Sequence, residues 1–77
     1  MIRSEFLELL KQNRIDVNLV SFAPELKDGY CVRKSHLRWE VFVRERGSEY
    51  EVLGFPSESN ALEYLFKELL SIYGKNT

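Results

Sequence analysis

The sequence predicts an α+β fold in the order αβββα, a three-stranded antiparallel meander with two helices packed on one face. Three observations predict it: an amphipathic helical pattern near each end, three apolar-rich segments between them, and short turn signals that separate those segments. A chain of 77 residues buries only about 60% of the surface that its unfolded form exposes. We therefore expect one core and a single domain over residues 1–77.

The first helix is predicted from Ser4 to Arg14. Phe6, Leu7 and Leu10 recur on one side of it, and charged or polar residues occupy the other. The next segment, from Ile15 to Gly29, breaks this pattern with turn residues. Its conformation stays open, apart from one short extended piece expected at Leu19 to Phe22.

Three strands are predicted next: Tyr30 to Lys34, Leu37 to Arg46 and Glu49 to Phe55, each rich in β-branched or aromatic residues. Gly47-Ser48 suits a two-residue turn in which glycine takes a positive φ, and Ser35-His36 suits a second turn.

These two turns predict a register and therefore two faces of the sheet. Arg33 lies opposite Arg38 and Arg44 lies opposite Glu51. One face, which carries Trp39, is predicted to pack on the helices, and the face that the helices leave open carries the arginine and glutamate pairs and three apolar residues, Phe42, Leu53 and Phe55.

The second helix is predicted to begin after Pro56, with Ser57 as its N-cap, and to run to about Tyr73 before Gly74. Its predicted core stripe is Ala61, Leu62, Leu65, Leu69, Ile72 and Tyr73. The last three residues, 75–77, are expected to fray.

Composition limits the classes of function. Eleven basic and twelve acidic residues leave a formal charge of −1, which favours neither nucleic acid nor an anionic membrane. One cysteine, Cys31, rules out an internal disulfide and is typical of a reducing cytoplasm. No apolar run approaches the length of a membrane span.

Chemistry-bearing motifs are scarce. Cys31 and His36 flank a predicted turn and form neither a metal site nor a nucleophile pair, and the four glycines occur singly rather than in a phosphate-binding loop. Glu49 and Glu51 are each expected to face an arginine, which keeps a carboxylate ionised. We therefore expect no enzyme, no metal and no cofactor.

Double-stranded-RNA-binding domains share the element order αβββα, and five basic residues lie within fourteen positions, from Arg33 to Arg46. Those domains grip phosphates with lysines at the start of their last helix. Here Ser57 and Glu58 occupy that position, so nucleic acid is the weaker alternative.

Two segments carry a family resemblance: Arg38 to Gly47, which reads W-E-V and then E-R-G, and Phe55 to Ala61, which reads F-x-S-E-x-x-A. In these segments the chain resembles a family of small bacterial immunity proteins from polymorphic toxin and contact-dependent inhibition systems. The resemblance spans roughly Tyr30 to Leu70. It implies tight, stoichiometric inhibition of one cognate toxin, by covering its active site or by docking beside it. The resemblance implies no catalytic residues and leaves the toxin's identity open.

We expect the partner to bind the open face, with an apolar centre and a charged rim. Phe42→Ala and Arg38→Glu are both expected to weaken binding and leave the fold intact. A homodimer that closes sheet to sheet is a further alternative. The predicted partner-binding residues are Arg33, Arg38, Glu40, Phe42, Arg44, Arg46, Glu49, Glu51, Leu53 and Phe55.

Overall fold

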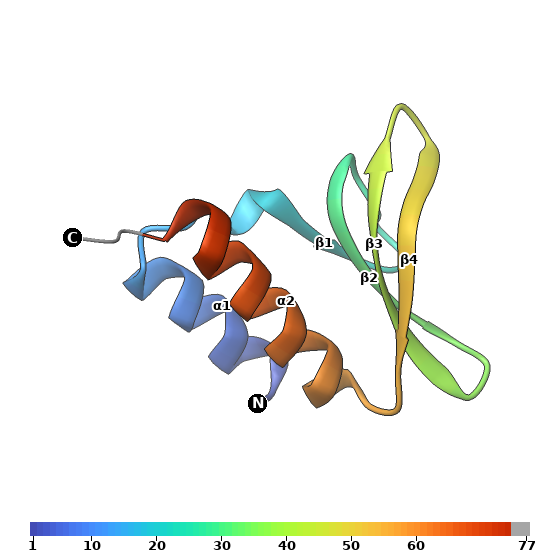
Figure 1. The fold of residues 1–77 in the computed structure, drawn as a ribbon, viewed down its shortest axis with the longest axis horizontal. Coiled ribbons are helices and arrows are strands. Elements are labelled where there is room, and N and C mark those ends of the chain that lie inside the picture. Colours follow the sequence, from blue (N-terminus) through green and yellow to red (C-terminus); the bar gives the residue numbers. More distant parts are fainter. Residues whose placement is uncertain (75–77) are drawn as a thin grey trace.

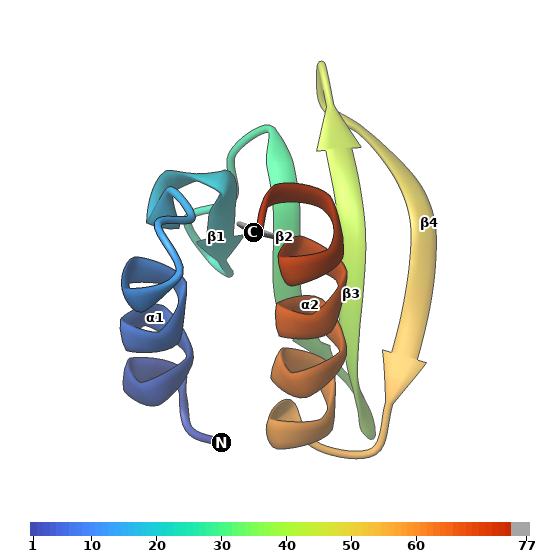
Figure 2. The same ribbon diagram turned by 60° about the vertical axis from the view of Figure 1, so that its left-hand side comes forward.

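The computed structural model describes residues 1–74, with two helices on one side of a four-stranded sheet (Figures 1 and 2). The expected fraying of residues 75–77 lies outside this range. The elements in chain order are helix α1 (Arg3–Gln12), the short 3₁₀ helix η1 (Val17–Leu19), strands β1 (Val20–Phe22), β2 (Gly29–Ser35), β3 (Arg38–Glu45) and β4 (Ser48–Phe55), and helix α2 (Glu58–Tyr73).

The predicted α+β class is confirmed, but the three-stranded antiparallel meander is not. The sheet has four strands in the order β1-β2-β3-β4, and β1 pairs with β2 in parallel. The extended piece expected at Leu19 to Phe22 is therefore a strand of the sheet.

Parallel strands are ordinarily joined by a dozen or more residues, so the short segment between β1 and β2 did not predict that they pair. Here residues 23–28 suffice, because β1 has only three residues, and a strand of that length spans only about 10 Å. Ala23 begins the return by donating a backbone hydrogen bond to the Val32 carbonyl (3.0 Å).

The first hairpin turns one residue later than predicted. His36 and Leu37 form the turn, with His36 at φ 52°, and Ser35 pairs with Arg38. Arg33 consequently lies opposite Glu40, not opposite Arg38. The predicted like-charge pair across these strands is wrong.

The second hairpin turns one residue earlier than predicted, at Arg46-Gly47. Both residues have positive φ (53° and 83°), as in a type I′ turn, so that Glu45 pairs with Ser48 and Arg44 with Glu49. Beyond this turn the register shifts at a β-bulge, where Glu51 has φ 55°.

The bulge changes the face of the sheet toward which the side chains at the end of β4 point. Val41 pairs with Leu53 and Trp39 with Phe55, so Leu53 and Phe55 share the helix side with Val41. A shift of one residue moves side chains to the opposite face. The predicted placement of Leu53 and Phe55 on the open face is therefore wrong.

The core lies between the sheet and the two helices. Trp39, Tyr30 and Phe55 are partly buried against it, as predicted for Trp39. Its buried members come from both helices and from three strands: Phe6 and Leu10 of α1, Val20, Val32 and Val41 of β1 to β3, Ala61, Leu62, Leu65 and Leu69 of α2, and also Ile15.

The second helix begins as predicted, because the Ser57 side chain accepts a hydrogen bond from the Asn60 backbone N–H at 3.1 Å. Among the described residues 1–74, neither helix is long and apolar enough to cross a membrane.

Gly29→Ala should lower the free energy of unfolding by about 2 kcal/mol, because a Cβ is strained at positive φ and crowds neighbouring backbone. Gly29 has φ 120°, and its Cβ would lie 2.9 Å from the Leu19 carbonyl oxygen. Gly47→Ala is the matched control, since Gly47 also has positive φ but has nothing within 4 Å of that position. Urea denaturation of both variants checks this, and an equal loss in the two would contradict the crowding at Gly29.

Candidate functional site

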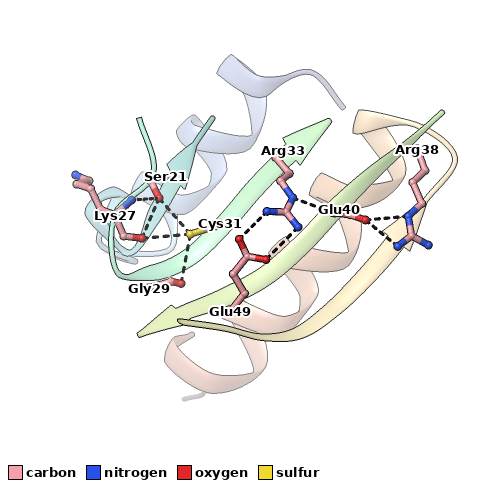
Figure 3. Close-up of polar contacts among 8 residues, drawn as sticks. All are labelled: Ser21, Lys27, Gly29, Cys31, Arg33, Arg38, Glu40 and Glu49. Atoms are coloured by element: carbon pink, nitrogen blue, oxygen red, sulfur yellow. Dashed lines mark hydrogen bonds and ion pairs between the residues drawn. The ribbon is translucent and has the colours of Figure 1, made fainter. Parts of the chain in front are cut away.

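The open face, which we define as the side of the sheet opposite α1 and α2, carries a network of four charged side chains (Figure 3). Arg33 on β2 donates from Nε to Glu40 Oε1 on β3 (2.8 Å) and from both terminal nitrogens to Glu49 on β4 (2.7 and 3.1 Å). Arg38 donates from Nε and Nη2 to Glu40 Oε2 (3.0 and 2.7 Å). The network thus ties three adjacent strands together.

Glu40 is the centre of this network and its most buried member. Its side chain is 7% exposed, although no helix covers this face. Hydrogen bonds from Arg33, and then from Arg38, hold the pKa of the Glu40 carboxyl below its usual range, against the opposing effect of burial. Glu40 is therefore a carboxylate at neutral pH, fixed between two guanidinium groups.

The two arginines differ in the exposure of their side chains and in the number of carboxylates that they bind. Arg33 is 28% exposed and binds two carboxylates. The Arg38 side chain is 57% exposed, and its Nη1 donates no hydrogen bond to the part of the chain that the structure describes. One edge of the Arg38 guanidinium is therefore bound by Glu40, and the other edge is open to solvent.

Phe42 lies beneath this network. It is 1% exposed and stands apart from the core cluster between the sheet and the helices. The Arg33 guanidinium carbon lies 4.3 Å from the centre of its ring, a cation–π arrangement. Phe42 is on the predicted face, but it is covered by its neighbours and is not an exposed apolar centre.

Arg44 and Arg46 lie at the far end of the same hairpin, beside the loop before β2. Arg44 donates from Nη1 to the Leu26 carbonyl oxygen (3.2 Å) and is 3.7 Å from Asp28 Oδ1, and the Arg46 backbone N–H donates to Asp28 Oδ2 (3.1 Å). Asp28 was absent from the predicted site. Asp28 directly precedes Gly29, which pairs with Arg44 across β2 and β3, and this register brings Asp28 beside Arg44 and Arg46.

Glu51 does not join the network, although Arg44 was expected to pair with it. The bulge carries Glu51 to the helix side, where it lines a small cavity with Tyr64 and Leu53. Of the predicted residues, the open face thus brings together Arg33, Arg38, Glu40, Phe42 and Glu49, with Arg44 and Arg46 at its margin.

Gly54→Ala should displace Arg38 without unfolding the protein. A Cβ on Gly54 would lie 2.6 Å from Arg38 Nη1 and 2.8 Å from its Cδ, so the flexible arginine must move. The unfolding free energy should change by less than about 1 kcal/mol, as is typical of a partly exposed ion pair. In ¹⁵N NMR spectra we expect the Arg38 Nε–H resonance to shift strongly and that of Arg33 to change little. An unchanged Arg38 resonance would contradict this geometry.

Comparison of the chain with protein-family models, with curated proteins and with solved structures finds no match.

Proposed function

We propose that this chain is an immunity-type protein, which binds one cognate bacterial toxin domain through the open face of its sheet and neutralises it. The observation that carries the proposal is Arg38, an exposed guanidinium held by a buried carboxylate on a face without helices. Side chains that are already ordered lose little conformational entropy on binding, and arginine is enriched in protein interfaces.

The open face also indicates what the partner supplies. Arg33 and Glu40 already satisfy one another, and Glu49 is bound by Arg33. Within this four-residue network, the outer edge of the Arg38 guanidinium stays exposed as a donor, and it suits a carboxylate of the toxin. Inhibition then results from occupying the toxin surface, and it needs no catalytic group on this chain.

An RNA-binding role is less compatible with the start of α2. Glu58 lies there, bound by Arg3 Nη2 at 2.7 Å, where a phosphate-gripping domain presents lysines. The Arg3–Glu58 ion pair is net neutral, so the start of α2 offers no excess positive charge to a nucleic-acid backbone.

Co-expression tests the proposal. On this proposal, a large secreted toxin is expected to be encoded beside the chain, and its C-terminal domain should arrest growth when it is expressed alone in a bacterial host. Co-expression of the chain should restore growth, and the two proteins should co-purify in a 1:1 ratio. Growth arrest that persists despite normal levels of the folded chain would overturn the proposal.

A further inference from the structure

Strand β1 lies at one edge of the sheet, beside β2 (Figure 2). A cavity of about 630 Å³ lies against this strand, lined by residues 20–27 and Arg3. Ligand sites in proteins typically have volumes of about 300 to 1,000 Å³. The edge of β1 is therefore next to a space large enough for a short part of another chain.

The pairing of β1 with β2 determines which of its backbone groups face this edge. The parallel register pairs Ser21 with Cys31, and Ala23 donates its N–H to the Val32 carbonyl (3.0 Å). Because alternate residues of a strand bond to opposite neighbours, Ser21 bonds to β2 as Ala23 does. Val20 and Phe22 therefore direct their N–H and C=O groups away from β2.

Two of these four outward groups are already satisfied. The Val20 N–H donates to the Val17 carbonyl of η1, and the Phe22 carbonyl accepts a hydrogen bond from the Glu25 N–H (3.0 Å). Within residues 1–74, the Val20 carbonyl accepts no hydrogen bond and the Phe22 N–H donates none. One acceptor and one donor, two residues apart, are thus open at the edge.

The two open groups match a single residue of a parallel strand. Such a residue lies opposite Ser21, donates its N–H to the Val20 carbonyl and accepts from the Phe22 N–H. An antiparallel strand would instead direct a carbonyl at the Val20 N–H and an N–H at the Phe22 carbonyl, and both of these groups are occupied. The edge therefore favours a strand that runs in the same direction as β1.

The loop that walls the cavity is fixed by hydrogen bonds to β1 and β2 (Figure 3). The Ser21 hydroxyl accepts from the Lys27 N–H (3.0 Å), and the Cys31 thiol donates to the Lys27 carbonyl (3.2 Å). Also at the cavity, the Arg3 guanidinium carbon lies 4.1 Å from the centre of the Phe22 ring. A site whose walls are already ordered loses little conformational entropy on binding.

A second copy of this chain suits the edge less well than a different protein does. Two copies of β1 related by a two-fold axis pair antiparallel, which is the arrangement that the occupied groups disfavour. The opposite edge strand, β4, is interrupted by the bulge at Glu51 and also carries Glu49, two features that discourage strand addition there.

We propose that the outer edge of β1 binds an extended segment of a protein partner by strand addition, parallel to β1. One residue of the segment is hydrogen-bonded to the Val20 carbonyl and the Phe22 N–H, and the neighbouring side chains occupy the cavity lined by residues 20–27 and Arg3. This site goes beyond the proposed function, because it uses neither Arg38 nor its network and does not require the partner to be a toxin.

Selection from a phage-displayed library of random twelve-residue peptides tests the site without any toxin. We expect peptides that bind with micromolar dissociation constants and slow the exchange of the Phe22 amide proton at least ten-fold, while the Ser21 amide, which bonds to β2, changes little. N-methylation of one peptide residue should weaken binding at least ten-fold. N-methylation of either neighbour should weaken it less than three-fold, because successive N–H groups of a strand point in opposite directions.

A nitroxide at the C-terminus of such a peptide should broaden the amide resonances of Ala23 and Glu25 more than those of Val17 and Asn18. The reverse would overturn the parallel direction. Failure to select a binding peptide, or peptides that leave exchange at Phe22 unchanged, would overturn the strand-addition site itself. Slower exchange at Phe22 on raising the protein concentration alone would show pairing between copies and contradict a different protein as the occupant. None of these outcomes depends on the growth test of the immunity function.

Discussion

Phe42→Ala should lower the free energy of unfolding by about 3–4 kcal/mol, the usual cost of truncating a fully buried phenylalanine. Phe42 is 1% exposed and lies beneath the Arg33 guanidinium. A small domain is stable by only about 5 kcal/mol or slightly more, so the variant should be close to unfolding at 37 °C. The expectation that this variant leaves the fold intact does not hold for a side chain so deeply buried.

Leu53→Ala is the control for this measurement, because Leu53 is 42% exposed and was assigned to the same apolar centre. It should lose about 1 kcal/mol or less, in proportion to the smaller apolar area that it buries. Urea denaturation at pH 7 separates the two variants. A larger loss for Leu53→Ala than for Phe42→Ala would contradict the burial of Phe42 on the open face.

Glu40→Gln should lower the free energy of unfolding by about 2–3 kcal/mol at pH 7, since it weakens several charge-assisted hydrogen bonds at once. The loss should stay below the larger cost of leaving a buried charge without a counter-ion. In the variant Arg33 is still paired with Glu49, and the Arg38 side chain is more than half exposed to solvent.

The difference between wild type and Glu40→Gln should depend on pH in a defined direction. The pKa of Glu40 is lowered in the folded protein, so its carboxylate stabilises the fold above the unfolded-state pKa of about 4.3. This contribution is lost as the pH falls through the lower, folded-state pKa. Denaturation at pH 7 and pH 3 should therefore show a smaller difference at pH 3, whereas Glu45→Gln, at an exposed position on the same strand, should cost little at pH 7. A difference that stays constant with pH would contradict the role of Glu40.

Local patterns in the sequence predicted the elements well. The apolar stripe and the Ser57 N-cap predicted α2 over Glu58–Tyr73, and β-branched and aromatic segments predicted β2, β3 and β4. The inward placement of Trp39 was also correct, because the shift of the first hairpin leaves the alternation of side chains along β3 unchanged.

The errors arose where the backbone departs from residue preference. Arg46 and Glu51 take positive φ, which non-glycine residues rarely adopt, so neither the early turn nor the bulge has a signal in the sequence. The bulge then moves Leu53 and Phe55 to the other face. The β1 pairing was missed because parallel contacts between distant backbone segments leave no local pattern.

For the candidate site, sequence reasoning identified Arg33, Arg38, Glu40 and Glu49 as residues of one face, but it did not identify how they pair. It placed Arg33 directly against Arg38 with no acidic side chain of this chain between them. In the structure Glu40 fills that place, and only the outer edge of Arg38 remains open.

Calorimetric titration with the toxin domain tests the central claim, binding through the open face, most directly. Arg38→Ala and Lys34→Ala each remove one exposed positive charge. Arg38 is on the open face, and Lys34 pairs across the strands with Trp39, on the opposite face. We predict that Arg38→Ala weakens affinity at least ten-fold, which corresponds to about 1.4 kcal/mol, while Lys34→Ala changes it less than two-fold and both variants retain cooperative melting. Unchanged affinity for Arg38→Ala, together with a loss for Lys34→Ala, would place the interface on the other face and contradict the account.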